Sequence, residues 1–166
     1  MKKELKAQLI DQIAAQISEN PNFYLANIEG LNAENTSALR RACFEKGVKL
    51  EVVKNTLLKK AIESKDNEDL KALYPTLAGS TAIMFTSLQT PNAPAKVIKE
   101  MSAKFGKPEL KAAYIQECLY LGAEQLPVLI NIKSREEMIG EIIGLLQSPI
   151  RRVVSALENA KKEAAE

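Results

Sequence analysis

A group of cationic and polar side chains occurs where a strand pattern gives way to a helix pattern. The group comprises Lys54, Asn55 and Thr56, followed one turn later by Lys59 and Lys60. Asn is a favoured N-cap residue, so we expect Asn55 to begin a helix whose first backbone N–H groups lack intrahelical partners. Unpaired N–H groups and ammonium groups together attract phosphate. From these residues alone an ordinary capped surface helix with solvated lysines is the favoured interpretation, and a surface that docks on a nucleic-acid backbone is the alternative.

A strand and an amphipathic helix would position this group. Apolar and charged residues alternate over 48–52, which predicts a strand with one buried face. The helix after it has apolar residues at helical spacing, namely Leu57, Leu58, Ala61 and Ile62. The cationic group would then lie at the junction of two ordered elements.

The composition excludes several classes of catalyst. None of the 166 residues is histidine, so His-based triads, imidazole general bases and the common Cys/His zinc sites are excluded. No glycine-rich phosphate loop occurs, and the carboxylates near 66–69 and 136–137 are typical of solvated helix starts. The net charge of +2 gives no general affinity for polyanions, so nucleic-acid contact requires local clustering. We expect no catalytic residue, no cofactor and no metal.

The cysteines and the N-terminal region indicate a cytoplasmic protein. Cys43 and Cys118 lack the Cys-x-x-Cys spacing of a redox or metal pair, so we expect two reduced, buried thiols. Glu4 and Asp11 interrupt the apolar core that a signal peptide would need. The longest uncharged run, 72–95, contains three prolines and is poor material for a membrane-spanning helix. We expect no membrane partner.

Strand and helix patterns alternate along the first part of the chain. Helices are expected at 3–19, 32–46, 55–62, 66–74 and 94–105, and strands at 23–28, 48–52, 82–85 and 109–115. This order predicts an α+β fold: an α-β plait, the ferredoxin-like split βαβ arrangement, with extra helices. The apolar run at 82–85 would also suit an open, doubly wound parallel sheet. Charged residues alternating at 49–51 and 109–111 favour the plait, with one sheet face covered and one partly open.

Beyond the globular part we expect only helices. Ser134 and Glu137 have capping-box spacing, which starts a helix. Ser148 and Pro149 then predict a break, with Ser148 as the cap and Pro149 as the first residue of a final helix. The expected organisation is a globular α+β domain at 1–130, a connecting helix at 131–147 and a C-terminal amphipathic helix at 148–166.

The final helix has an apolar stripe that consists of Ile150, Val153, Val154, Leu157 and Ala160. A helix of about 22 Å is marginal in water without a packing partner, so the stripe requires a surface to cover it. Two interpretations remain open: the helix folds back on its own domain, or it enters a groove of another protein. The terminal position slightly favours a protein partner.

Four segments resemble the bacterial ribosomal protein L10 family. They are VVKNTLLKKA at 52–61, LAGSTAIMF at 77–85, KAAYIQECL at 111–119 and the tail REEMIGEIIGLLQSPIRRVVSALENAKKEAA at 135–165. The resemblance extends over nearly the whole chain. It implies an α-β plait that binds large-subunit ribosomal RNA beside ribosomal protein L11, and a C-terminal helix that carries dimers of the stalk protein L7/L12. Those dimers recruit translation GTPases.

The resemblance also assigns candidate residues. It makes Lys54, Asn55 and Thr56 the main RNA-binding candidates, with Lys59, Lys60, Lys2 and Lys3 as phosphate partners. It makes the stripe at 150–160 the partner-binding face for stalk dimers. The implied role is a noncatalytic constituent of the cytoplasmic large ribosomal subunit. Two other classes are a non-ribosomal helical adaptor, which would need only the final helix, and a small cytosolic enzyme, which would need a pocket of convergent polar groups.

Overall fold

The chain forms two units, Met1–Ile132 and Lys133–Glu166. The structure is a computed structural model that describes residues 3–64, 68–87 and 90–163, with side chains described for 6–64, 70–87 and 90–156. Within those ranges, no helix combines the length and apolar character needed to cross a membrane. The elements of the first unit are α1 (Lys3–Glu19), β1 (Asn22–Asn27), α2 (Ala33–Glu45), β2 (Lys49–Val53), α3 (Asn55–Glu63), α4 (Glu68–Lys71), η1 (Tyr74–Thr76), β3 (Thr81–Thr86), α5 (Ala93–Phe105), β4 (Glu109–Ile115), β5 (Cys118–Leu121), η2 (Ala123–Gln125) and α6 (Leu126–Asn131).

The strands form one sheet in the order β2-β3-β1-β4-β5, and every neighbouring pair is antiparallel. Helix α2 connects β1 to β2, and β3 lies between these two strands. Helix α5 connects β3 to β4, and β1 lies between them. Two interleaved split βαβ units define the α-β plait, so this prediction is confirmed and the doubly wound parallel sheet is excluded.

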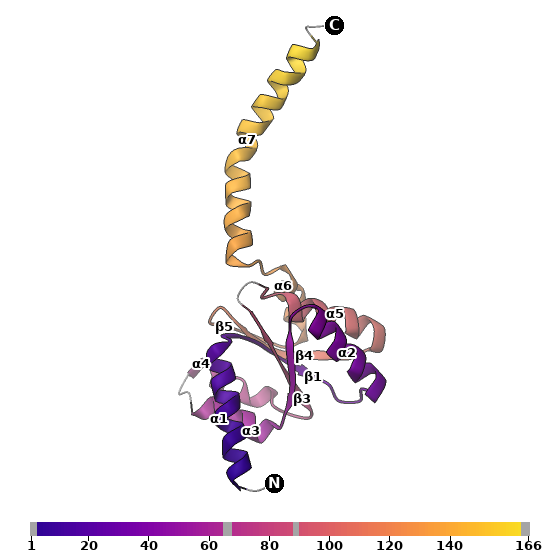
Figure 1. Cartoon of the computed structure of the whole chain (residues 1–166), viewed down its shortest axis with the longest axis vertical. Coiled ribbons are helices and arrows are strands. Elements are labelled where there is room, and N and C mark those ends of the chain that lie inside the picture. The colour runs from indigo at the N-terminus through magenta and orange to yellow at the C-terminus, as the bar shows by residue number, and fades with distance from the viewer. Residues whose placement is uncertain (1–2, 65–67, 88–89, 164–166) are drawn as a thin grey trace. The chain divides into compact units, whose positions relative to one another are not determined.

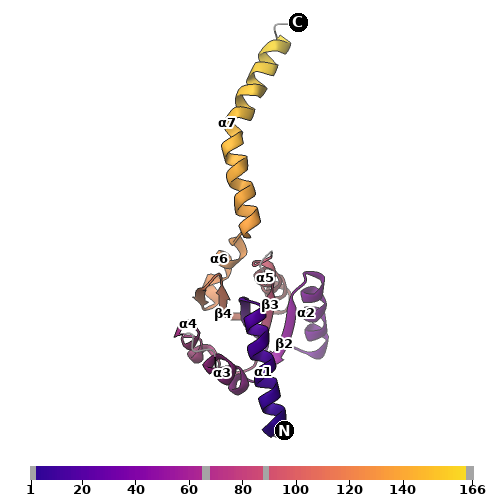
Figure 2. The ribbon, with the colours of Figure 1, turned by 60° about the vertical axis from the view of Figure 1, so that its left-hand side comes forward.

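Helices cover both faces of the sheet, so the prediction of one partly open face is wrong. Tyr24 and Ala26 of β1 pack in one core with residues of α2, α5 and α6. Phe23 and Leu25 point the other way, into a second core with α1, α3 and α4. Figures 1 and 2 show α1 and α3 on one side of the sheet and α2 and α5 on the other. The N-terminal helix and the helices inserted between β2 and β3 thus cover the second face.

The charged alternation at 49–51 has a different origin from the one expected. Strand β2 is at the edge of the sheet, where Lys49 Nζ and Glu51 Oε1 pair at 3.0 Å. Charged side chains are common on edge strands because they hinder pairing with another chain. The alternation therefore marks an edge strand rather than an open face.

Strand β5 has no counterpart among the expected elements. It pairs with β4 through a tight hairpin whose two turn residues, Gln116 and Glu117, have φ values of 50° and 64°. Glycine or asparagine usually occupies such positions, because positive φ is unfavourable for other side chains. The sequence lacks that signal, so the hairpin was not expected.

The two cysteines have different environments. Cys43 of α2 is buried in the core, and burial raises the pKa of its thiol to about 11. Cys118 is exposed at the start of β5, so the prediction of two buried thiols is wrong for this residue. The reason is the unexpected hairpin, which places Cys118 on an edge strand.

We expect a thiol reagent at pH 8 to modify Cys118 rapidly and Cys43 only after unfolding. The thiolate is the reactive form, and both burial and a raised pKa suppress it at Cys43. A colorimetric thiol count should give one fast-reacting group per native chain and two in denaturant. The Cys118→Ser variant should give none while native. Two fast groups in the native chain would contradict the buried position of Cys43.

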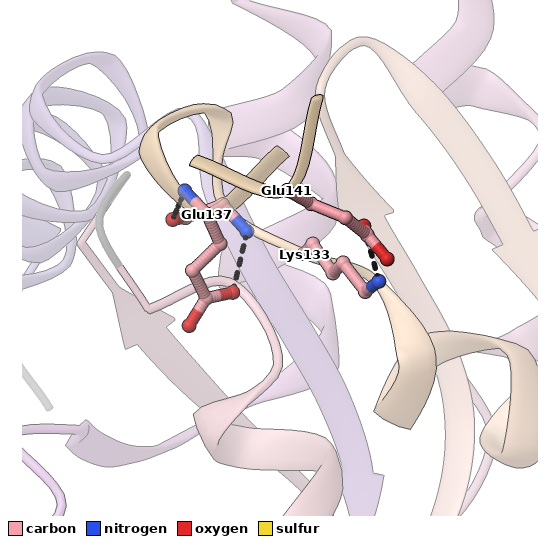
Figure 3. Close-up of polar contacts among 4 residues, drawn as sticks. Lys133, Glu137 and Glu141 are labelled. Carbon is pink, nitrogen blue, oxygen red and sulfur yellow. Dashed lines mark hydrogen bonds and ion pairs between the residues drawn. The ribbon is translucent and has the colours of Figure 1, made fainter. Parts of the chain in front are cut away.

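The second unit contains one long helix, α7 (Arg135–Glu163). The predicted capping box begins it: Ser134 Oγ accepts from the Glu137 N–H at 3.1 Å, and Glu137 Oε2 accepts from the Ser134 N–H at 3.0 Å. Lys133 also pairs with Glu141 across the first turns. Figure 3 shows the Glu137 and Glu141 carboxylates in these contacts. The helix start is therefore held by local side chains.

The expected break at Ser148 and Pro149 is wrong, because Pro149 lies inside α7. At 3.6 residues per turn, the large apolar residues from Met138 to Val154 fall within roughly half of the helix circumference, so one face continues across the proline. Proline removes one helical hydrogen bond, and helices often kink there. The ribbon of α7 bends partway along its length in Figures 1 and 2. A single helix, Arg135–Glu163, thus runs through the region in which a connecting helix and a separate final helix were expected.

Candidate functional site

The cationic group lies between β2 and α3, but the helix begins differently from the prediction. Lys54, rather than Asn55, occupies the N-cap position, with φ −72° and ψ 126° and no side-chain cap. Its carbonyl accepts hydrogen bonds from the Leu57 and Leu58 N–H groups at 2.9 and 3.1 Å. The side chains of Lys54 and Thr56 are exposed. Two of the predicted RNA-binding residues are therefore accessible beside the first turn of α3.

Asn55 fastens a neighbouring loop to α3. Its Nδ2 donates to the carbonyl of Leu77 at 3.0 Å and to that of Gly79 at 2.7 Å. The buried Oδ1 has no hydrogen-bond partner among the described residues. The amide N–H groups that we expected to face RNA are thus used inside the protein. These two hydrogen bonds join Asn55 to residues 22 and 24 positions later in the chain, and local capping rules do not predict such long-range contacts.

The loop brings together two of the segments noted in the sequence. A shallow depression of about 470 Å³ lies between the β2–α3 junction and the start of β3. It is lined by Val52, Val53, Lys54, Asn55, Thr56, Gly79, Ser80 and Thr81. Residues 78–80 are exposed. We call exposed Lys54 and Thr56, with loop residues 78–80, the Lys54 surface.

Lys111 of β4 holds the same loop and was not among the expected site residues. Its Nζ donates to the carbonyls of Ala78 and Ser80 and to Thr81 Oγ1, the last two at 2.8 Å. Burial lowers the pKa of the Lys111 ammonium group, and the Glu29 carboxylate partly opposes this. The only sequence signal was the position of Lys111 at the start of the resembling segment 111–119.

The other expected cations lie further from the loop or outside the described side chains. Lys59 and Lys60 are exposed on the next turn of α3. The Nζ of Lys59 is 4.9 Å from the centre of the Tyr74 ring, which is a cation–π contact within the protein. Lys2 lies outside the described residues, as does the side chain of Lys3, the first residue of α1. The structure thus places Lys54 and Thr56 beside the loop.

We expect Asn55→Asp to destabilise the first unit by about 1–3 kcal/mol. The substitution replaces a donor to two carbonyls with an acceptor, although a negative charge at a helix start is otherwise favourable. Thr56→Asp is the matched control, since it adds the same charge one residue later without removing that donor. Urea unfolding followed by circular dichroism measures both. Equal stability of the two variants would contradict the structural role of the Asn55 amide.

Helix α7 carries the second candidate site. Nine large apolar side chains on it are exposed, and we call them the α7 apolar face: Met138, Ile139, Ile142, Ile143, Leu145, Leu146, Ile150, Val153 and Val154. Three of the five predicted partner-binding residues belong to this set. Leu157 and Ala160 continue α7, but their side chains lie outside those described. The apolar face therefore begins twelve residues before Ile150, where the expected stripe began.

The described part of the chain offers little for catalysis. It contains no group of three or more Cys, Asp or Glu residues that could hold a metal ion. A cavity of about 370 Å³ between α1, β2 and α3 has a predominantly apolar lining. Two of its polar residues, Gln16 and Glu51, are joined by a hydrogen bond of 3.1 Å. The convergent polar groups expected for an enzyme pocket are not seen there.

Comparison with known proteins agrees with the resemblance noted in the sequence. Residues 1–103 match the family model described as "Ribosomal protein L10". The chain is 55% identical to "Large ribosomal subunit protein uL10" of Christiangramia forsetii over 96% of this chain and 90% of that protein. It is 50% identical to the protein of the same name from Flavobacterium johnsoniae, over the full length of both. The protein of that name from Cytophaga hutchinsonii is 38% identical, over 100% of this chain and 99% of that protein.

These matches define the class of the protein. It is a structural, nonenzymatic component of the bacterial ribosome, and its location is the cytoplasm. Specifically, the chain belongs to the ribosomal protein L10 family of the large subunit.

Proposed function

We propose that this protein forms the base of the stalk of the large ribosomal subunit. In this proposal the first unit binds large-subunit ribosomal RNA beside ribosomal protein L11. Helix α7 anchors dimers of the stalk protein L7/L12, which recruit translation GTPases. The observation that carries the proposal is α7 itself, a helix of 29 residues with an extensive exposed apolar face.

The energetics of α7 support a partner-binding role. Each large apolar side chain that becomes fully buried contributes roughly 1.5–3 kcal/mol, so the α7 apolar face can hold helical partners firmly. In proteins most of a helix's stability comes from packing of its apolar face, so an exposed α7 apolar face favours a partner that covers it. A single continuous helix gives partners a longer surface than the separate helix expected at 148–166.

The Lys54 surface supports the RNA-binding role. Its exposed Lys54 ammonium group can pair with a phosphate, and the Thr56 hydroxyl and loop N–H groups can donate hydrogen bonds. Lys59 and Lys60 add positive charge on the next turn of α3. The net charge of only +2 makes this local cluster more informative than the overall charge.

A pull-down with the tagged full-length chain tests the proposal. From bacterial extract at low salt, the chain should retain both large-subunit ribosomal RNA and the stalk protein, and nuclease treatment should release the RNA but leave the stalk protein bound. Retention of the stalk protein alone would favour the adaptor function. Retention of neither would contradict both binding roles.

A further inference from the structure

The carbonyl groups of residues 77–80 are all held by two side chains. The Asn55 side-chain amide donates to the carbonyls of Leu77 and Gly79, at 3.0 and 2.7 Å. Lys111 donates to the second and fourth of the four carbonyls, the latter at 2.8 Å. Alternate carbonyls therefore bond to different elements, α3 on one hand and β4 on the other. The loop is therefore held in place through its backbone carbonyls, which accept hydrogen bonds from the two side chains.

The loop's donors are left for an external partner. In a trans peptide the N–H points away from the carbonyl of the same planar unit, so it also points away from the side chain that binds this carbonyl. No described residue accepts a hydrogen bond from the N–H groups of 78–80, and these residues are exposed. A segment with bonded carbonyls and unbonded N–H groups attracts anions.

The ammonium group of Lys111 is fully occupied within the protein. It has three N–H donors, and it donates to the Ala78 carbonyl, the Ser80 carbonyl and Thr81 Oγ1. No donor remains for a phosphate. Lys111 therefore differs in kind from exposed Lys54, whose ammonium group has no hydrogen bond or ion pair within the described part of the chain.

We propose that Lys111 is a positioning residue of the RNA-binding surface, which orders the loop at 77–80 without touching RNA. The inference rests on the proposed function, since it concerns the same surface. Its effect on affinity comes from preorganisation: a loop that is already ordered does not lose conformational entropy when RNA binds.

The salt dependence of binding distinguishes a positioning lysine from a contacting lysine. Affinity falls as salt increases, and each lost phosphate contact makes the slope of log affinity against log salt shallower by roughly 0.7–0.9. We expect Lys111→Met to weaken binding of in vitro transcribed large-subunit ribosomal RNA about tenfold with an unchanged slope. The matched control, Lys54→Met, removes an ammonium group that we expect to contact phosphate, so it should make the slope shallower. Filter binding with the full-length chain at several salt concentrations measures both.

Chemical rescue provides a test that a general loss of stability would not pass. In a Cys118→Ser background, Lys111→Cys introduces one accessible thiol, because Cys43 is buried. Alkylation with 2-bromoethylamine forms a carbon–sulfur bond with loss of bromide and yields a side chain that ends in an ammonium group at nearly the length of lysine. Affinity should recover to within about threefold of the parent chain, again without a change of slope.

A milder variant covers the case in which Lys111→Met does not fold. Thr81→Val removes one of the three acceptors and keeps the shape of the side chain. It should weaken RNA binding about threefold with the slope unchanged. Full affinity of a folded Thr81→Val chain would then contradict the proposal.

The possible outcomes separate this inference from the proposed function. Loss of affinity in Lys111→Met with a constant slope, reversed by aminoethylation, supports the inference. A shallower slope in Lys111→Met would show direct phosphate contact and overturn the inference. Unchanged affinity in Lys111→Met, with a loss of affinity in Lys54→Met, would also overturn it. If neither lysine variant changes RNA binding, the proposed RNA-binding surface itself is wrong.

Discussion

The double substitution Ile150→Asp with Val153→Asp should abolish binding of stalk-protein dimers, with a loss of affinity of at least about 100-fold. Both side chains lie on the α7 apolar face and are 63% and 60% exposed. If they pack in a partner's groove, the substitutions bury unpaired carboxylates, which costs several kcal/mol. Isothermal titration of the full-length chain with purified stalk protein measures the loss.

A matched control separates this interface effect from weakening of the helix. Ser155→Asp adds the same kind of charge to α7, roughly on the opposite side from Val153, and carries the same low helix propensity. It should bind stalk dimers within about threefold of the parent. Arg151→Ala should also have a small effect, because Arg151 is exposed and bonds only to Gln147 at 3.1 Å among the described residues. Equal losses in Ser155→Asp and the double variant would argue against a specific apolar interface.

The substitution Lys54→Glu should weaken binding of large-subunit ribosomal RNA on the order of 10- to 100-fold near 0.1 M salt. It removes a cation at the N-terminal end of α3 and places a carboxylate beside the exposed loop at 78–80. The deficit should shrink as salt increases, because both the lost attraction and the new repulsion are screened. Filter binding across a salt series measures the effect.

Lys104→Glu is the control for this prediction. It changes the net charge by the same amount, but Lys104 lies near the end of α5, which packs on the opposite face of the sheet from α3. Affinity within about twofold of the parent is expected, since exposed charges separated by more than a Debye length interact little. If Lys104→Glu and Lys54→Glu weaken binding equally, RNA attraction depends on net charge and not on the Lys54 surface.

Local sequence rules predicted those parts of the fold in which neighbouring residues determine the backbone. Helix α5 ends at Phe105, just before Gly106, whose φ of 70° suits glycine, and α7 begins at the capping box of Ser134 and Glu137. The order of strands and helices also sufficed for the α-β plait. In these cases the signal and the structure it specifies lie within a few residues of each other.

Errors occurred where distant residues determine the outcome. Asn55 has the sequence context of an N-cap, but its side-chain amide instead donates hydrogen bonds to the carbonyls of Leu77 and Gly79. The rule for Pro149 predicts a helix break, whereas the apolar pattern on both sides of it has the phase of one helix. The covered second sheet face depends on α1 and on helices inserted between β2 and β3, which strand periodicity does not report.

The candidate sites show the same division. Exposed Lys54 and Thr56 were predicted from a local strand-to-helix pattern, as were the apolar residues of α7. Lys111 was missed because its role depends on three acceptors 30 to 33 residues earlier in the chain. A lysine in a strand pattern gives no sign of which carbonyls it will meet, so its position in the sheet had to be known first.

The central claim is that the two units have separable binding roles, and measuring both ligands on both variants tests it most directly. Full-length Lys54→Glu and full-length Ile150→Asp with Val153→Asp should each be titrated with large-subunit ribosomal RNA and with purified stalk protein. We expect Lys54→Glu to lose RNA affinity and keep stalk binding, and the α7 variant to lose stalk binding and keep RNA affinity. Loss of both ligands in either folded variant, or of neither ligand in both, would contradict the claim.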